Sequence, residues 1–329
     1  MNNSLTAAII GSGYIGKRHI AAYKSLGLKI VVCSNDIETG QQLAEEYNAK
    51  FYEDYHEMLQ KEKLDLVSVC LPTYLHYDAT MAALDSHVNV LCEKPFSLNS
   101  EEARKMVNKA KEKGLLFMIG HCVRFSQPYE YLKHCVKDLR FGKLTYLNLF
   151  RHGVAPGWSV GNWFENTALS GGALRDLHIH DTDIVVSTFG MPKAVYTTGN
   201  AFACSTVYTY DEANLSVTGS ASWRKATDAP PQVGYDAIFE NGTVLLRNGV
   251  FEAYDQNGKV ESALESEEFG AFFAPLGEDP IKYEIAYFCD CLMKNAAPEI
   301  CLCEDSLKSV ITNCAETESL HNRVSISIP

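Results

Sequence analysis

The sequence predicts an α/β fold followed by an α+β fold: a doubly wound parallel sheet at the N-terminus, then a domain built mainly on antiparallel strands. Between residues 5 and 120, short apolar runs alternate with helical patterns, as in parallel sheets whose strands are joined by helices. After about residue 122, strand-like runs follow one another closely, and Asn-Gly pairs between them favour hairpin turns. The change of pattern predicts one domain over residues 1–122 and another over residues 123–329.

The first apolar run, residues 5–10, leads directly into the turn Gly11-Ser12-Gly13-Tyr14-Ile15-Gly16, and a helical pattern follows through Leu26. In such a strand–turn–helix unit, Gly11 permits the tight turn, Gly13 lets the backbone approach a pyrophosphate, and Gly16 lets helix and strand pack closely. The backbone N–H groups at the helix start then hold the phosphates. The motif indicates dinucleotide binding in preference to a plain turn.

The rest of the first domain continues the alternation, with strands expected at 29–33, 50–52, 64–71, 88–92 and 115–120 and helices at 38–47, 75–86 and 100–113. Ligands of parallel sheets bind beyond the carboxyl ends of the strands, where Ser34, Pro72-Thr73 and Glu93-Lys94 lie. Asp36 follows the glycine turn by about 20 positions, the spacing of an acidic residue that holds the adenosine ribose. Its alternative role is to cap the next helix.

The second domain begins with a helical pattern at 128–139 and a strand at 143–152, followed by a segment rich in Gly, Pro and Trp. A helix is expected from about 173 to 189, then strands at 194–200, 204–210, 213–223, 235–239, 243–246 and 250–254. Asn241-Gly242 and Asn257-Gly258 are hairpin turn pairs. Two helices, at about 281–293 and 304–322, close the chain.

Composition narrows the class of protein. A formal net charge of −12 argues against nucleic acid or an anionic membrane as partner. We see neither a signal-peptide pattern nor an apolar stretch long enough to span a membrane, and we expect a cytoplasmic protein. The eleven cysteines lie mostly in apolar runs, which favours reduced, buried thiols. The Cys-x-Cys pairs lack zinc-site spacing, so no metal site is predicted.

Glu93-Lys94-Pro95 comes at a strand end on the ligand-binding edge of the predicted sheet. A lysine at that edge is a fixed cation near a bound ligand, and Pro95 can set a cis bond that orients it. The alternative is a surface lysine in a turn.

A second cluster follows Gly171-Gly172. Asp176 and His180 are four residues apart, which places them on one face of the expected helix. A carboxylate beside an imidazole suits general base catalysis, because the carboxylate orients the ring and stabilises its protonated form. The alternative is a structural Asp–His pair. His178 and Asp183 do not share that face with His180, which disfavours a metal site there.

Together, these motifs resemble a known family. They are the glycine turn with His19, Leu71-Pro72-Thr73 with His76, Glu93-Lys94-Pro95, Gly120-His121 with Arg124-Phe125, and Gly171-Gly172 with Asp176 and His180. Their order and spacing are similar to those of the glucose–fructose oxidoreductase and inositol dehydrogenase family, of the Gfo/Idh/MocA type. The resemblance implies an N-terminal Rossmann domain and a C-terminal domain whose open sheet forms a homodimer or homotetramer interface. It also implies reversible oxidation of a secondary hydroxyl on a sugar or cyclitol with NAD(P).

The resemblance implies roles for individual residues. Lys94 would bind and polarise the reacting hydroxyl, His180 would take its proton, and Asp176 would hold His180 or contact the sugar. The residues expected at the cofactor are Gly11, Gly13, Tyr14, Ile15, Gly16, Ser34, Asn35, Asp36, Leu71, Pro72, Thr73, His76, Glu93, Lys94 and His121. Those expected at the substrate are Lys94, Arg124, Arg151, His152, Trp163, Asp176, His180 and Tyr283.

Some positions leave alternatives open. The position that is often acidic in NAD-using members falls on Ser34, and no Arg or Lys lies between Cys33 and Gly40 to hold a 2′-phosphate. NAD is therefore slightly favoured over NADP. Arg124 can meet a substrate carboxylate or phosphate, or pair with a local acid. Trp158, Asn162 and Trp163 suit a sugar pocket or simple loop packing.

Three other functions remain open at this point. One is a glycosidase that oxidises and later reduces its sugar with bound NAD. Another is a non-enzymatic dinucleotide-binding regulator, which the joint presence of Lys94, Asp176 and His180 disfavours. The third is a reductase of a dihydrodiol or tetrapyrrole, which the polar segment from Arg151 to Asn162 disfavours.

Overall fold

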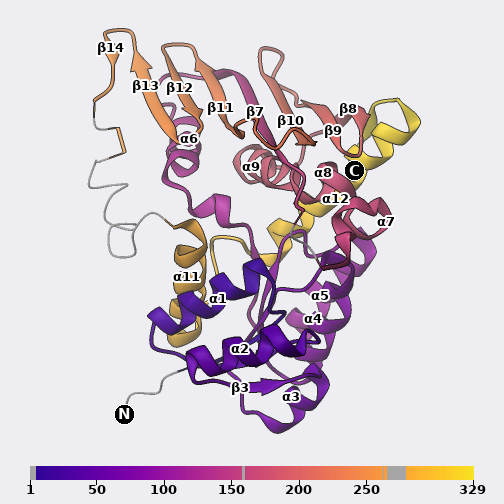
Figure 1. The fold of residues 1–329 in the computed structure, drawn as a ribbon. Coiled ribbons are helices and arrows are strands. Elements are labelled where there is room, and N and C mark those ends of the chain that lie inside the picture. The colour runs from indigo at the N-terminus through magenta and orange to yellow at the C-terminus, as the bar shows by residue number, and fades with distance from the viewer. Residues whose placement is uncertain (1–4, 158–159, 262, 265–278) are drawn as a thin grey trace. The chain divides into compact units, whose positions relative to one another are not determined.

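The computed structural model describes residues 5–157, 160–261, 263–264 and 279–329 (Figure 1). The chain divides into two compact units. Unit 1 comprises Met1–Cys122 and Asp279–Leu307, and unit 2 comprises Val123–Glu278 and Lys308–Pro329. The first border falls where the sequence pattern changes, and the segment 279–307 packs with unit 1.

Unit 1 contains a six-stranded parallel sheet in the order β3-β2-β1-β4-β5-β6. The central strands are buried because helices cover both faces, which explains their continuous apolar sequences. The strands are β1 (Thr6–Ile10), β2 (Lys29–Cys33), β3 (Lys50–Tyr52), β4 (Leu66–Val69), β5 (Asn89–Glu93) and β6 (Phe117–Gly120). The helices are α1 (Tyr14–Ser25), α2 (Ile37–Tyr47), α3 (Tyr55–Lys61), η1 (Thr73–Leu75), α4 (His76–Asp85), α5 (Ser100–Lys113) and α11 (Pro280–Lys294).

Side-chain caps set where several of these helices begin. Asp36, Asp54 and Asn99 accept hydrogen bonds from backbone N–H groups in the first turns of α2, α3 and α5. Asp36 thus takes the capping role that the sequence offered as the alternative to ribose binding. The short-range signals for caps and strand ends explain why the predicted elements of this unit match the observed ones closely.

Unit 2 is built on a nine-stranded sheet in the order β14-β13-β12-β11-β7-β10-β9-β8-β15. Its pairs are antiparallel except β7 with β10, so the sheet is mixed and mostly antiparallel. The strands are β7 (Leu144–Val154), β8 (Ala194–Asn200), β9 (Ala203–Thr209), β10 (Ser216–Arg224), β11 (Gln232–Phe239), β12 (Gly242–Arg247), β13 (Val250–Asp255), β14 (Gly258–Lys259) and β15 (Ile326–Ser327). The predicted two-domain fold class is confirmed.

Helices cover one face of this sheet. The core of unit 2 joins Leu147 and Leu149 of β7 to Ile184 and Val185 of α9 and to side chains of α6. Figure 1 shows α6 and α9 on the same side of the sheet. The helices of the unit are η2 (Cys122–Phe125), α6 (Gln127–Lys137), η3 (Val160–Glu165), α7 (Thr167–Ser170), α8 (Gly172–Asp176) and α9 (Ile179–Phe189), together with α12 (Cys303–Asn322), which begins in unit 1.

The expected single helix from 173 to 189 is wrong. Two helices stand in its place, α8 and α9, separated at Leu177 and His178. The N–H groups of both Leu177 and His178 donate to the carbonyl of Ala173, which widens the turn there. The break lets the His178 ring pack against Gly219 of β10, where a Cβ would lie 2.8 Å from the ring. A tertiary contact therefore divides a segment whose local sequence is helical throughout.

Two expectations from composition can be compared with the structure. All eleven cysteines fall in the described part of the chain, where no disulfide links them, and nine of them are buried. Among the described residues, no helix is both long and apolar enough to span a membrane.

Candidate active site

The three glycines of the first turn have different surroundings. Gly11 has a φ of +111°, and a Cβ there would lie 2.5 Å from the carbonyl oxygen of Cys70. A Cβ on Gly16 would collide with the Gly11 carbonyl. A Cβ on Gly13 would meet no heavy atom within 4 Å, and this residue precedes α1 as its N-cap without a side-chain hydrogen bond. The turn therefore fits a pyrophosphate that approaches the backbone at Gly13 and the first turn of α1.

The end of β2 is connected to this turn. Ser34 and Ser12 share a hydrogen bond of 2.6 Å between their hydroxyl oxygens, and both side chains are buried. Ser34 Oγ also accepts from the N–H of Asp36 at 3.1 Å. Asp36 Oδ1 accepts from the N–H of Thr39, and the side-chain and backbone hydrogen bonds of Thr39 hold the pKa of Asp36 below its ordinary value. Ser34 and Asp36 thus have structural partners at the position predicted to meet the cofactor ribose.

The predicted cofactor residues after β4 lie at the same edge of the sheet. Leu71, Pro72 and Thr73 lead into η1, and His76 begins α4. The His76 ring lies between two loops, with Nε2 2.7 Å from the Leu71 carbonyl oxygen and Nδ1 3.0 Å from that of Pro95. Burial lowers the pKa of His76, while the contacts of its two ring nitrogens hold the ring between these loops.

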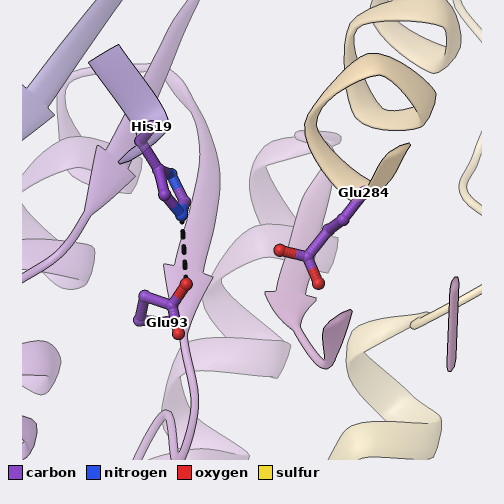
Figure 2. A group of neighbouring side chains, drawn as sticks. All are labelled: His19, Glu93 and Glu284. Atoms are coloured by element: carbon purple, nitrogen blue, oxygen red, sulfur yellow. Dashed lines mark hydrogen bonds and ion pairs between the residues drawn. The ribbon is translucent and has the colours of Figure 1, made fainter. Parts of the chain in front are cut away.

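Glu93 ends β5, and the Lys94–Pro95 peptide bond is cis. Glu93 belongs to a buried group with His19 of α1 and Glu284 of α11, whose side chains point toward one another in Figure 2. His19 Nε2 lies 3.0 Å from Glu93 Oε1. Burial raises the pKa of Glu93, but the hydrogen bond of His19 and the charges of His19, Lys94 and His76 together outweigh it, and the net pKa is below the ordinary value. Gly120 makes room for both carboxylates, because a Cβ there would lie 3.1 Å from Glu93 Oε1.

Imidazole and carboxylate oxygens are donor types that bind divalent cations, and the ligand atoms of this group lie within 4.8 Å of one another. The opposite ring nitrogen, His19 Nδ1, lies 3.1 Å from Ser68 Oγ, which is in turn 2.6 Å from the Tyr23 hydroxyl. A chain of hydrogen bonds from Tyr23 to Glu93 accounts for the orientation of the ring without a cation. We therefore describe the group as a buried polar link between α1, β5 and α11. The absence of a metal site stays a sequence-based prediction.

Sequence reasoning missed Glu284. It lies on the buried face of α11, and its charge in an otherwise apolar stripe was the available signal. The neighbouring Tyr283, predicted at the substrate, is also buried on this helix. His121, predicted at the cofactor, follows β6 and is buried as well.

Asp176 and His180 lie in unit 2 on different helices. Asp176 is the last residue of α8 and His180 the second of α9, and both are half-buried. The expected shared helix face is therefore wrong, because the break at Leu177 and His178 separates them. Lys94, the third predicted catalytic residue, belongs to unit 1.

Arg124 and Arg151 form buried ion pairs. Arg124 Nε and Nη2 donate to the two carboxylate oxygens of Asp183 at 2.7 and 2.6 Å. Arg151 Nε and Nη2 donate to Asp181 Oδ1 at 3.2 and 2.8 Å. For Arg124, this favours the local acid over a substrate anion. Both guanidinium groups have structural partners where the sequence predicted substrate contacts.

His152 follows Arg151 on β7, so its side chain points to the other face of the sheet. It lies in a cleft of about 430 Å³ on that face, lined also by Ser220, Asp236 and Arg247. His152 Nδ1 lies 2.8 Å from Ser222 Oγ, and burial lowers the pKa of the ring. Arg151 and His152 therefore point to opposite faces of the sheet.

Trp163 packs within the loop. Its ring stacks on Phe164 with centroids 3.9 Å apart, and Phe164 meets Trp223 edge-on. The packing of Trp163 is therefore the loop packing that the sequence offered as the alternative to a sugar pocket. Asn162 has a φ of +49° in η3 and is exposed. Trp158, which the sequence placed with them, lies outside the described residues.

Comparison with known proteins identifies the family. Residues 5–121 match the profile described as an oxidoreductase family with an NAD-binding Rossmann fold, and residues 129–242 match the GFO/IDH/MocA C-terminal domain. The chain belongs to the GFO/IDH/MocA oxidoreductase family. The resemblance read from the motifs is confirmed, as is an N-terminal unit of the NAD(P)-binding class.

Two curated relatives are similar in sequence. A 2,7-anhydro-N-acetylneuraminate hydratase from Mediterraneibacter gnavus is 34% identical over 197 residues, covering 60% of this chain and 52% of the relative. A D-glucoside 3-dehydrogenase from Escherichia coli is 32% identical over 234 residues, covering 67% and 66%. The alignments thus span about half to two-thirds of these relatives. The fold is similar to that of a myo-inositol 2-dehydrogenase from Lactobacillus plantarum, with a TM-score of 0.82, 23% identity, and 99% and 100% of the two chains covered.

Proposed function

We propose that the protein is an NAD(P)-dependent dehydrogenase that oxidises a secondary hydroxyl of a sugar, sugar derivative or inositol reversibly. The glycine turn supports this most directly, because it leaves space beside Gly13 in a chain that belongs to an oxidoreductase family. The similarity to a glucoside dehydrogenase supports a polyhydroxylated substrate.

In this proposal, the Lys94 ammonium binds the reacting hydroxyl and polarises it. His180 accepts the hydroxyl proton, and Asp176 holds the imidazole or contacts the sugar. NAD(P), when bound, accepts the hydride, whereas the protein supplies position, charge and a proton acceptor. General base assistance of this kind typically contributes about 10²–10⁴ in rate.

The cofactor is proposed to be NAD in preference to NADP. The segment after β2 offers no Arg or Lys between Cys33 and Gly40, and Ser34 already pairs with Ser12. Measured dissociation constants should be lower for NAD, and tighter binding of NADP would overturn this preference.

The test of the activity is a panel of sugars, sugar phosphates, uronic acids and inositols with each cofactor, followed by absorbance at 340 nm. A rise with one polyol would establish the reaction, the substrate class and the cofactor together. Cofactor binding without turnover of any kind would instead favour a dinucleotide-binding regulator.

A second candidate is a reaction in which the cofactor ends in its starting oxidation state, as in the NAD-dependent glycosidase alternative. The similarity to a hydratase supports it, since that name describes no net oxidation. Such an enzyme would convert its substrate without a lasting change at 340 nm. Product analysis by mass spectrometry on anhydrosugars and nitrophenyl glycosides would distinguish it from the dehydrogenase.

We further propose that unit 2 forms a homodimer or homotetramer through the sheet face opposite α6 and α9. That face bears exposed apolar side chains, including Tyr196, Val207 and Ile238. Exposed apolar side chains on a broad sheet face are typical of association surfaces.

A further inference from the structure

The N-terminal part of α9 buries three consecutive polar residues. Asp181, Thr182 and Asp183 are almost fully inaccessible and directly follow His180. Successive residues point to different sides of a helix, so this turn is enclosed on several sides. Each of the three side chains contacts a different set of elements in unit 2, and the turn is held by polar contacts.

Asp183 has the closest contacts. Arg124 of η2 donates to both of its carboxylate oxygens, and Ser309 of α12 donates to Oδ1 at 2.8 Å. The Arg124 and Asp183 side chains are 4% and 1% exposed, so solvent does not weaken the pair. Because the guanidinium and the carboxylate meet through two hydrogen bonds, their relative orientation is fixed as well as their distance.

Asp181 and Thr182 hold the same turn from other directions. Asp181 accepts from Arg151 of β7, whose guanidinium also donates to the Tyr129 hydroxyl at 3.2 Å. Thr182 Oγ1 donates to Glu316 of α12 at 2.9 Å. These contacts matter for His180 because the helix break at Leu177 and His178 removes α8 as a continuous support.

We propose that Arg124 and Asp183 are positioning residues that set where α9 presents His180. The inference rests on the proposed general base role of His180. Loss of the pair would leave the substrate and cofactor contacts intact but displace the imidazole. A displacement of about 1 Å can lower a rate roughly 10²-fold. Arg124 thereby acts through α9, without contacting a substrate anion.

The first test is Asp183→Asn, which preserves shape but removes the charge. We expect kcat to fall roughly 10- to 100-fold, with substrate KM and NAD(P) affinity near wild type and a changed pH profile of kcat/KM. Arg124→Lys, which keeps the charge without the planar fork, should retain more kcat than Arg124→Met. A raised KM with unchanged kcat in Arg124→Met would overturn the proposal, because it would indicate a substrate contact.

The double variant Arg124→Met/Asp183→Leu separates positioning from stability. Replacing both partners of a buried pair by apolar groups often preserves stability, so this protein should unfold near the wild-type temperature yet keep the low kcat. Wild-type kcat in the folded double variant would overturn the proposal. The matched control is Glu130→Leu/Lys133→Met, which removes an ion pair on α6 and should leave kcat unchanged.

A readout without turnover separates this proposal from the proposed function. NMR of ¹³C-labelled histidine, with the His180 signal assigned by its loss in His180→Ala, follows the ring directly. The His180 signal and its titration should move in Arg124→Met/Asp183→Leu and stay fixed in the control. An unchanged signal would overturn the positioning role. If the signal moves while the wild type oxidises no polyol, only the proposed activity fails.

Discussion

At the scale of single residues, the atoms around each glycine of the first turn decide its role. Gly11, Gly13 and Gly16 occupy one turn, yet their missing Cβ atoms face a carbonyl, open space and another carbonyl respectively. Only Gly13 leaves room for a ligand, whereas the other two permit the close approach of strand and helix. The motif in the sequence predicts all three roles. The contacts at Gly11 and Gly16 fit the tight turn and the close packing, and pyrophosphate binding at Gly13 stays a prediction.

Alanine substitutions should separate these roles. Gly13→Ala should lower the free energy of unfolding by no more than about 1 kcal/mol, because its Cβ meets no neighbour and only the helix cap changes. NAD(P) affinity should fall at least about tenfold, or 1.4 kcal/mol. Gly16→Ala should cost about 3 kcal/mol or more, because its Cβ collides with backbone. Urea unfolding measures the stability of each variant, and calorimetry measures its NAD(P) affinity. Equal destabilisation by the two variants would contradict the different roles of Gly13 and Gly16.

His180→Ala should abolish most turnover without weakening the cofactor complex. We expect kcat to fall by about 10²–10⁴, the usual contribution of a general base, while the NAD(P) dissociation constant stays near wild type. Steady-state kinetics and calorimetry provide the measurements. His321→Ala, an exposed histidine at the end of α12, is the control. Wild-type turnover in His180→Ala would remove it from the mechanism.

At the scale of elements, a buried carboxylate holds the part of α12 that lies in unit 2. Glu316 accepts hydrogen bonds from Thr182, Tyr208 and Asn313, at 2.9, 2.8 and 2.6 Å. Burial raises the pKa of Glu316 to about 7 despite these donors. The nearby His178 ring, 4.0 Å away, has its pKa lowered to about 3 by burial. Sequence patterns do not predict such a network, because Thr182, Tyr208 and His178 come from parts of the chain far from α12 in the sequence.

Glu316 should make stability depend on pH. Its pKa is higher in the folded than in the unfolded chain, so folding takes up a proton between the ordinary value of 4.5 and about 7. Its contribution therefore falls as pH rises through this window, by on the order of 3 kcal/mol. Glu316→Gln should become more stable relative to wild type between pH 5 and pH 8, as measured by urea unfolding. Parallel stability curves for the two proteins would contradict the assignment.

At the scale of the whole molecule, the exposed face of the nine-stranded sheet is the surface on which assembly is proposed. Val207 of β9 and Ile238 of β11 are 47% and 44% exposed there. A stable homodimer usually buries about 800 Å² on each partner, and a broad sheet face can supply that area. The alternation of apolar and polar residues along each strand predicts that one face of the sheet, the face opposite this one, is apolar and covered.

Charged substitutions on this face should dissociate the proposed oligomer. Val207→Lys/Ile238→Lys should lower the molar mass measured by light scattering, while circular dichroism stays that of the wild type. Met293→Lys, at an exposed position on α11, should leave the mass unchanged. A wild-type protein that is already monomeric would refute the proposed interface.

The sequence by itself determined most of the elements, the fold class and the glycine turn. Strand runs, helix caps at Asp36 and Asp54, and Asn-Gly turns are local signals, and local backbone preferences decide them. The order of motifs was sufficient to indicate the family.

Only the tertiary structure decided which polar residues face one another. Two partners distant in sequence, such as Arg124 and Asp183 or His19 and Glu284, become neighbours through packing. The same is true of the break between α8 and α9, because His178 enters space beside Gly219. Periodicity describes which face a residue occupies on its own element. It does not describe what the rest of the chain places against that face.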